Sequence, residues 1–196
     1  MNKPLLVYDK LPEGYQEIRL YSIRDRSFRL ITGPVSFLIS LAAAFLIYCL
    51  KTRFHLNSFV FEWHWIYLLD LALLLAAYTA AHEITHGIVY KLISPRKLKF
   101  GIRGSLAYCG LPGVYMEKRA AYLSLLAPFV LYSILFLFLL WLVPLNTFWM
   151  ILLLAFMNHL GGCSADLYTA YWIAAAPEDL LIMDAGDEQH FYVPHP

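Results

Sequence analysis

Four long apolar stretches constrain the fold of this chain more than any other feature of its sequence. They cover residues 30–50, 64–93, 120–143 and 147–174. A helix that crosses a bilayer needs about 20 mainly apolar residues, so each stretch is long enough to do so. Hydrophobic residues make up 60% of the sequence, whereas soluble domains have about 45–50%. We therefore expect an all-α membrane protein with four transmembrane helices.

Lys and Arg residues are distributed unevenly between these stretches. Six precede residue 30, seven lie in or beside the segment 94–119, and Lys51 and Arg53 lie between the first two stretches. Basic residues concentrate on the cytosolic side of membrane proteins, so this pattern predicts that both termini are cytosolic (N-in/C-in). The net charge of +1 does not indicate a nucleic-acid partner.

The composition divides the chain into three expected segments. Residues 1–29 form a cytosolic N-terminal segment, residues 30–174 a four-helix membrane domain, and residues 175–196 an acidic cytosolic tail. Residues 94–119 connect the second and third helices and contain four glycines and alternating apolar positions. Such a pattern is typical of short strands, so we expect a Gly-rich cytosolic loop that forms a β-hairpin.

The second apolar stretch contains the pattern His82-Glu83-Ile84-Thr85-His86. Residues i and i+4 of a helix lie one turn apart on the same face, so His82 and His86 can present two imidazoles to one zinc ion. Glu83 lies beside them, where a carboxylate can act as general base on a water molecule. Ionisable groups at membrane depth are costly and are rarely retained without a partner or a function. The pattern therefore predicts a zinc centre.

A catalytic zinc site needs a third protein ligand. With a rise of about 1.5 Å per residue, Asp166 in the fourth stretch lies at a depth similar to that of the His pair. Depth favours Asp166 as the third ligand, toward the cytosolic leaflet. His159, Cys163 and the more distant Asp70 remain as alternatives.

Other classes of protein also fit parts of this pattern. The main alternative is a non-catalytic membrane adaptor or regulator with a structural metal site, although such a site has no need of a base like Glu83. A di-iron oxidase would require further His clusters. A transporter is a poor match, because the sequence contains no inverted repeat.

The HExxH pattern followed two helices later by an aspartate resembles the site-2 proteases, which are intramembrane zinc metalloproteases. Their second motif reads Asn-x-x-Pro-x-x-x-Leu-Asp-Gly, and Asn158 and Asp166 stand at its spacing here. The chain differs at Gly161, Ala165 and Leu167, where that motif has proline, leucine and glycine.

The chain resembles more closely a family of small bacterial membrane proteins described as zincin peptidases. Four segments carry this resemblance: His82–Gly87, Leu126–Phe129, Gly162–Tyr168 and Asp184–Asp187. The resemblance extends from about Arg29 to the end of the chain.

The resemblance implies a membrane-embedded zinc metalloprotease of the HExxH type in a multi-pass protein of the bacterial cell membrane. By this resemblance His82, His86 and Asp166 bind Zn²⁺ and Glu83 activates water. Asn158 either donates a hydrogen bond to the substrate carbonyl or its oxyanion, or bonds to another helix. The expected partners are membrane lipids and a membrane-protein or peptide substrate, with no nucleic acid. The oligomeric state is left open.

Overall fold

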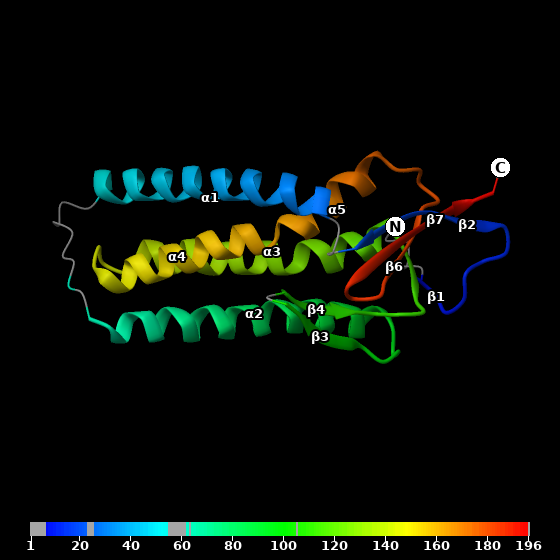
Figure 1. Ribbon diagram of the computed structural model, residues 1–196, viewed down its shortest axis with the longest axis horizontal. Helices are drawn as coiled ribbons and strands as arrows, with labels where there is room; N and C mark the ends of the chain where they lie inside the picture. The colour runs from blue at the N-terminus through cyan, green and yellow to red at the C-terminus, as the bar shows by residue number, and fades with distance from the viewer. Residues whose placement is uncertain (1–6, 23–25, 55–61, 63, 105, 196) are drawn as a thin grey trace. The chain divides into compact units, whose positions relative to one another are not determined.

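The computed structural model describes residues 7–22, 26–54, 62, 64–104 and 106–195 (Figure 1). The chain divides into two compact units. The first, here called the sheet unit, comprises Met1–Arg29, Ala80–Pro128 and Asp166–Pro196. The second, here called the helical unit, comprises Leu30–Thr79 and Phe129–Ala165. Each unit is therefore assembled from segments that are far apart in the sequence.

The helices follow the apolar stretches of the sequence. They are α1 (Arg26–Phe54), α2 (Ile66–Ile93), α3 (Lys118–Leu142), α4 (Thr147–Gly162) and α5 (Ser164–Ala175). Within the described residues, four stretches are long and apolar enough to cross a membrane: 33–54, 66–93, 118–142 and 147–175. The four predicted helical stretches are thus confirmed, with the last one divided at Cys163 into α4 and α5. The N-in/C-in orientation stays a prediction.

A short connection joins α3 to α4. Asn146 caps α4, because its side-chain oxygen accepts a hydrogen bond from the backbone N–H of Trp149 at 3.0 Å. Such a cap satisfies one of the backbone donors that the first turn of a helix leaves without a partner. The cap defines where α4 begins after Pro144.

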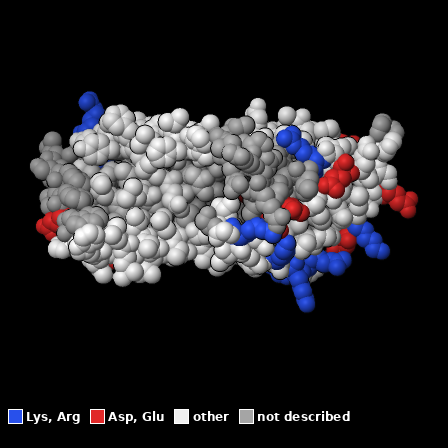
Figure 2. Space-filling view, in the orientation of Figure 1, with Lys and Arg blue, Asp and Glu red and all other residues white. Residues whose placement is uncertain are grey.

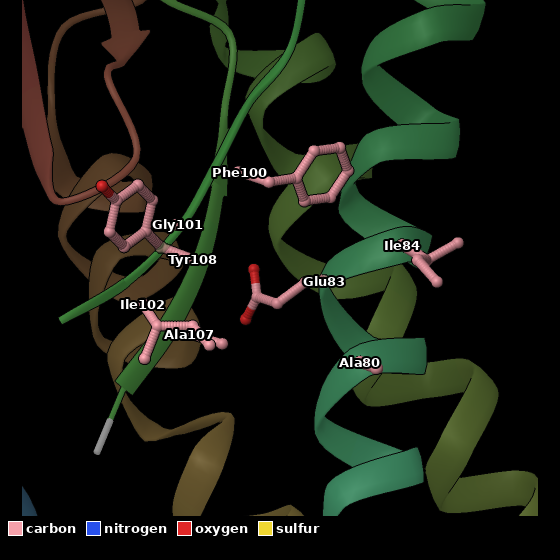
Figure 3. A pocket seen from close by; sticks show the side chains of 8 residues that line it. All are labelled: Ala80, Glu83, Ile84, Phe100, Gly101, Ile102, Ala107 and Tyr108. Carbon is pink, nitrogen blue, oxygen red and sulfur yellow. The ribbon is translucent and has the colours of Figure 1, made fainter. Parts of the chain in front are cut away.

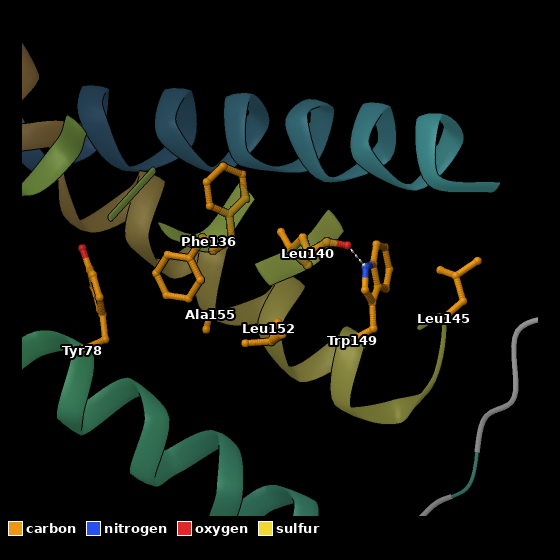
Figure 4. Close-up of a cluster of buried hydrophobic side chains, with 8 residues drawn as sticks. Tyr78, Phe136, Leu140, Leu145, Trp149, Leu152 and Ala155 are labelled. Atoms are coloured by element: carbon orange, nitrogen blue, oxygen red, sulfur yellow. Dashed lines mark hydrogen bonds between the residues drawn. The ribbon is translucent and has the colours of Figure 1, made fainter. Parts of the chain in front are cut away.

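Aromatic and aliphatic side chains form the core of the helical unit (Figure 4). Trp149 is fully buried there, and its indole N–H donates to the backbone carbonyl of Leu140 at 2.9 Å. A buried tryptophan needs such a partner for its polar atom. The cluster contains Tyr78, Phe136, Leu140, Leu145, Trp149, Leu152, Ala155 and Phe156.

The two ends of the chain form a five-stranded antiparallel sheet. Its strands are β1 (Val7–Tyr8), β2 (Tyr15–Ser22), β5 (Tyr115–Glu117), β6 (Leu181–Asp184) and β7 (Glu188–Pro194). They are arranged in the order β1-β5-β6-β7-β2. The register of β2 on β7 runs from the Tyr15–Pro194 pair to the Ser22–Glu188 pair, with an irregularity between Glu17 and Arg19.

This sheet corrects the expectation of an all-α protein. Strand β2 of the N-terminal segment and strand β7 of the tail pair with each other within one unit. A strand of a few residues gains its hydrogen bonds from a partner that is distant in the chain, so local periodicity indicates it poorly.

The predicted hairpin between the second and third helical stretches is confirmed. Strands β3 (Lys99–Arg103) and β4 (Leu106–Gly110) pair in antiparallel register, with Gly101 opposite Tyr108. A Cβ atom at Gly101 would lie 2.3 Å from the Tyr108 hydroxyl oxygen, so the aromatic ring requires glycine at this position.

Two buried clusters connect the helices of the sheet unit to its strands. One surrounds Tyr90 of α2 and includes Cys109, Leu111 and Met116. The other joins the first turns of α3 to α5 and the sheet through Leu125, Ile173, Leu180, Ile182 and Phe191, among others. The part of α2 that contains His82 and His86 therefore lies in the packed sheet unit.

Candidate metal centre

Three predicted ligands converge in the sheet unit. His82 and His86 lie one turn apart on α2, with their Nε2 atoms 3.2 Å apart. Asp166 lies in the first turn of α5, and its Oδ2 atom is 3.3 Å from Nε2 of His82 and 3.6 Å from Nε2 of His86. Among the described residues, these three side chains form a group that could hold a metal ion.

The separations of the three donor atoms fit a zinc ion. Tetrahedral ligands at about 2.0–2.1 Å from zinc lie about 3.3 Å from one another. The observed separations of 3.2, 3.3 and 3.6 Å lie close to that value. Two imidazole nitrogens and a carboxylate oxygen also match the donors of catalytic zinc sites, which leave a fourth position open.

A backbone carbonyl orients the ring of His86. Nδ1 of His86 lies 2.8 Å from the carbonyl oxygen of Ser124, and since a carbonyl can only accept, Nδ1 carries the donated proton. With the proton on Nδ1, the electron pair on Nε2 is the one that a metal ion can bind, and Nε2 faces Asp166. Metal-binding histidines commonly have such an outer partner, which fixes their tautomer and orientation. Both histidines of the pair are buried.

Glu83, which follows His82 in the chain, lies on the wall of a pocket. Its carboxylate extends from α2 toward the hairpin (Figure 3). The pocket has a volume of about 310 Å³ and is otherwise mainly apolar. The remaining lining residues are Ala80, Ile84, Phe100, Gly101, Ile102, Ala107 and Tyr108. A carboxylate in this position can exchange a proton with a molecule bound in the pocket.

The other candidate residues belong to other surroundings. Asn158 is an exposed residue of α4 in the helical unit, and Asp70 is an exposed residue of α2. Both ring nitrogens of buried His159 have partners in that unit: Nδ1 lies 2.7 Å from the Tyr78 hydroxyl and Nε2 lies 2.9 Å from that of Ser133. The Sγ atom of Cys163 lies 3.5 Å from Nδ1 of His159 in the same unit, so Asp166 is the candidate for a third ligand that the structure brings to the His pair.

Tyr90 belongs to the site's surroundings and has no place in the predicted site, whereas its partner Asp184 begins the Asp184–Asp187 segment that carries the family resemblance. The Tyr90 ring stacks on that of His86, with 6.4 Å between centroids and 21° between planes. Its hydroxyl donates to Oδ2 of Asp184 at 2.7 Å. Tyr90 lies four residues after His86, as His86 does after His82, and this spacing indicates that all three side chains share one face of α2. The pairing with Asp184 has no local signal in the sequence.

The donor set and the neighbouring carboxylate have the composition of a hydrolytic zinc centre. The family model described as "Putative zincin peptidase" (DUF3267) matches residues 74–181, and the chain belongs to that family. The matched range includes His82, Glu83, His86 and Asp166. No curated protein and no solved structure matches the chain significantly.

Proposed function

We propose that this protein is a membrane-embedded zinc metallopeptidase that hydrolyses peptide bonds at or within the cytosolic leaflet. The convergence of His82, His86 and Asp166 carries the proposal, because their three donor atoms have the separations of zinc ligands. Glu83 is adjacent to His82 in the chain and lines a pocket. Membership of the zincin family supports a peptidase.

The proposed chemistry assigns a role to each side chain. His82, His86 and Asp166 would hold zinc, which when bound supplies a Lewis acid and makes a water molecule more acidic. Glu83 accepts a proton from the attacking water and delivers it to the nitrogen of the departing amine. The peptide bond breaks with one water consumed, and Glu83 ends the cycle as a carboxylate.

The hairpin provides a place for an extended substrate. The strands β3 and β4 form a two-stranded sheet, so among the described strands each has an outer edge without a partner strand. An extended peptide can bind such an edge through backbone hydrogen bonds. Under this proposal the apolar pocket receives a side chain of a membrane-derived segment. The predicted role of Asn158 as a hydrogen-bond donor stays a prediction, since this residue lies in the helical unit.

The surfaces of the two units support insertion in a membrane. Figure 2 shows the Lys and Arg side chains of this face gathered mainly over the sheet unit, while the described surface of the helical unit carries few charges. Leu38, Phe45, Ile134 and Phe138 are among the exposed apolar residues of that unit. Basic residues near anionic head groups are stabilised by about 1 kcal/mol each. The proposed orientation places the sheet unit on the cytosolic side.

Purification of the full chain in detergent tests this function. We expect the wild type to bind one zinc ion and to cleave peptides derived from membrane segments. Glu83→Gln retains zinc and loses at least about 100-fold in kcat, since proton transfer by a positioned side chain contributes about 10²–10⁴-fold. His86→Ala and Asp166→Ala lose both zinc and cleavage. Metal content is measured by elemental analysis and cleavage by mass spectrometry.

Matched substitutions outside the site provide the controls. Glu13→Gln and His64→Ala change exposed residues of the same types and should leave both measurements unchanged. A wild type without stoichiometric metal would rule out the proposed function. Zinc bound without cleavage, and with Glu83→Gln behaving like the wild type, would instead favour a structural metal site in a non-catalytic adaptor.

A further inference from the structure

The turn between β6 and β7, residues Asp184–Asp187, contacts both α2 and the hairpin that lines the Glu83 pocket. The carboxylate of Asp184 is buried and is surrounded by donors. Oδ2 accepts from the Tyr90 hydroxyl at 2.7 Å and from Nε2 of Gln189 at 3.3 Å, and Oδ1 accepts from the Gly186 N–H at 2.7 Å. This end of the turn is therefore anchored to the helix of the metal centre.

The other end of the turn is bound to strand β3. The carboxylate of Asp187 pairs with Lys99 at 3.0 Å and also with Arg103. Lys99 additionally donates to the backbone carbonyl of Ala185 at 3.1 Å and lies over the Tyr108 ring. One carboxylate thus holds cations from the first and last residues of β3.

Backbone contact joins the same turn to strand β4. A Cβ atom at Gly110 would lie 2.2 Å from the backbone nitrogen of Gly186. A Cβ atom at Gly186, which has φ of +96°, would lie 2.5 Å from the Tyr108 ring. Glycine is therefore required on both sides of this contact. The N–H of Leu111 also donates to the carbonyl of Asp184 at 2.7 Å.

The contacts of the Asp184–Asp187 turn hold the same hairpin that lines the Glu83 pocket. The hairpin supplies the wall opposite Glu83, including Phe100, Ile102 and Tyr108 (Figure 3). The position of that wall therefore depends on the contacts that the turn makes with β3 and β4. We propose that the Asp184–Asp187 turn is a positioning element that clamps the hairpin over the Glu83 pocket and so sets how substrate binds there. The effect on substrate rests on the proposed peptidase function, whereas the clamp itself does not.

Asp187→Asn tests the clamp, because it removes the charge and keeps the shape of the side chain. Cys109 on β4 is a natural probe, since it is buried and burial raises the pKa of its thiol to about 12. A thiol with such a pKa reacts slowly until the hairpin opens. We expect maleimide to modify Cys109 at least about fivefold faster in Asp187→Asn than in the wild type, as measured by peptide mass spectrometry.

The same variant tests the positioning role. Zinc content should remain that of the wild type, while KM for a membrane-derived peptide rises several-fold and kcat changes little. Asp179→Asn, an exposed carboxylate in the loop before β6, should match the wild type in every measurement. Lys99→Gln combined with Arg103→Gln should reproduce the effect of Asp187→Asn, and adding Asp187→Asn to that pair should have little further effect.

The outcomes separate the clamp from the proposed function. An unchanged rate of Cys109 modification overturns the clamp. Faster modification with unchanged KM and kcat overturns the positioning role. A wild type that cleaves no peptide, combined with faster modification of Cys109 in Asp187→Asn, overturns the peptidase proposal and leaves the turn's hold on the hairpin established.

Discussion

The imidazole of His86 is held on three sides. Its Nε2 atom faces Asp166, its Nδ1 atom donates to the Ser124 carbonyl, and its face stacks on Tyr90. A ring held in this way keeps one tautomer and one orientation, which a metal ligand needs before the metal arrives. Tyr90 is itself held by Asp184, whose pKa is raised by burial despite the hydrogen bonds from Tyr90 and Gly186.

Tyr90→Phe isolates the contribution of one hydroxyl group. The variant keeps the stacking on His86 but leaves Asp184 buried with one donor fewer. Loss of a hydrogen bond to a buried charged group costs about 1–3 kcal/mol. We expect the free energy of unfolding to fall by that amount in denaturant titrations.

The control for this variant is Tyr171→Phe, which removes a hydroxyl from a side chain that is 77% exposed. It should unfold like the wild type. Equal stability of Tyr90→Phe and the wild type would show that the hydrogen bond from Tyr90 to Asp184 does not stabilise the fold.

At the scale of elements, the hairpin and the β6–β7 turn fit together through glycines. Gly110 and Gly186 allow the two backbones to approach more closely than any side chain would permit. The hairpin also packs on α2, where a Cβ atom at Gly87 would lie 2.9 Å from the Phe100 ring. A side chain introduced at Gly110 meets backbone atoms and must push two elements apart, whereas one introduced at Gly87 meets the end of the Phe100 side chain.

Gly110→Ala should therefore be strongly destabilising. The added methyl group meets backbone atoms of the turn at 2.2 and 2.6 Å, and these cannot move as the end of a flexible side chain can. Overpacking of this kind costs about 1–3 kcal/mol. Thermal unfolding in detergent measures the effect.

Gly161→Ala on α4 is the matched comparison, because nothing lies within 4 Å of a Cβ atom there. Alanine favours a helix over glycine by up to about 1 kcal/mol, so this variant should be neutral or slightly stabilising. Similar effects of the two substitutions would show that the turn yields to the added methyl group.

At the scale of the whole molecule, the candidate centre connects helices that are distant in the sequence. His82 and His86 come from α2 and Asp166 comes from α5. A metal ion that binds only the folded site stabilises the folded state, by about 2.7 kcal/mol at a concentration of 100 times its Kd.

Zinc should accordingly raise the Tm of the wild type by several degrees, and removal of zinc with a chelator should reverse the shift. His82→Ala should abolish the shift because it removes one of three donors, whereas His64→Ala should retain it. Differential scanning fluorimetry at several zinc concentrations measures both. A Tm that is independent of zinc in the wild type would count against a metal centre at these residues.

The sequence by itself determined the elements whose signals are local. Long apolar runs predicted the four helical stretches, because a helix that crosses a bilayer needs about 20 mainly apolar residues in succession. Alternation and glycines predicted the β3–β4 hairpin, and the i, i+4 spacing predicted that His82 and His86 share a helix face. Helix rise alone indicated Asp166 as a third ligand, and the structure places it beside the pair.

The tertiary structure decided whatever depends on contacts between distant segments. The pairing of β2 with β7 joins the two ends of the chain, and neither strand carries a pattern strong enough to indicate its partner. The same holds for Tyr90 with Asp184 and for Asp187 with Lys99. The fold brings together groups that are separated by many residues in each of these contacts. Such a contact produces no periodic pattern in the sequence, so sequence periodicity cannot predict it.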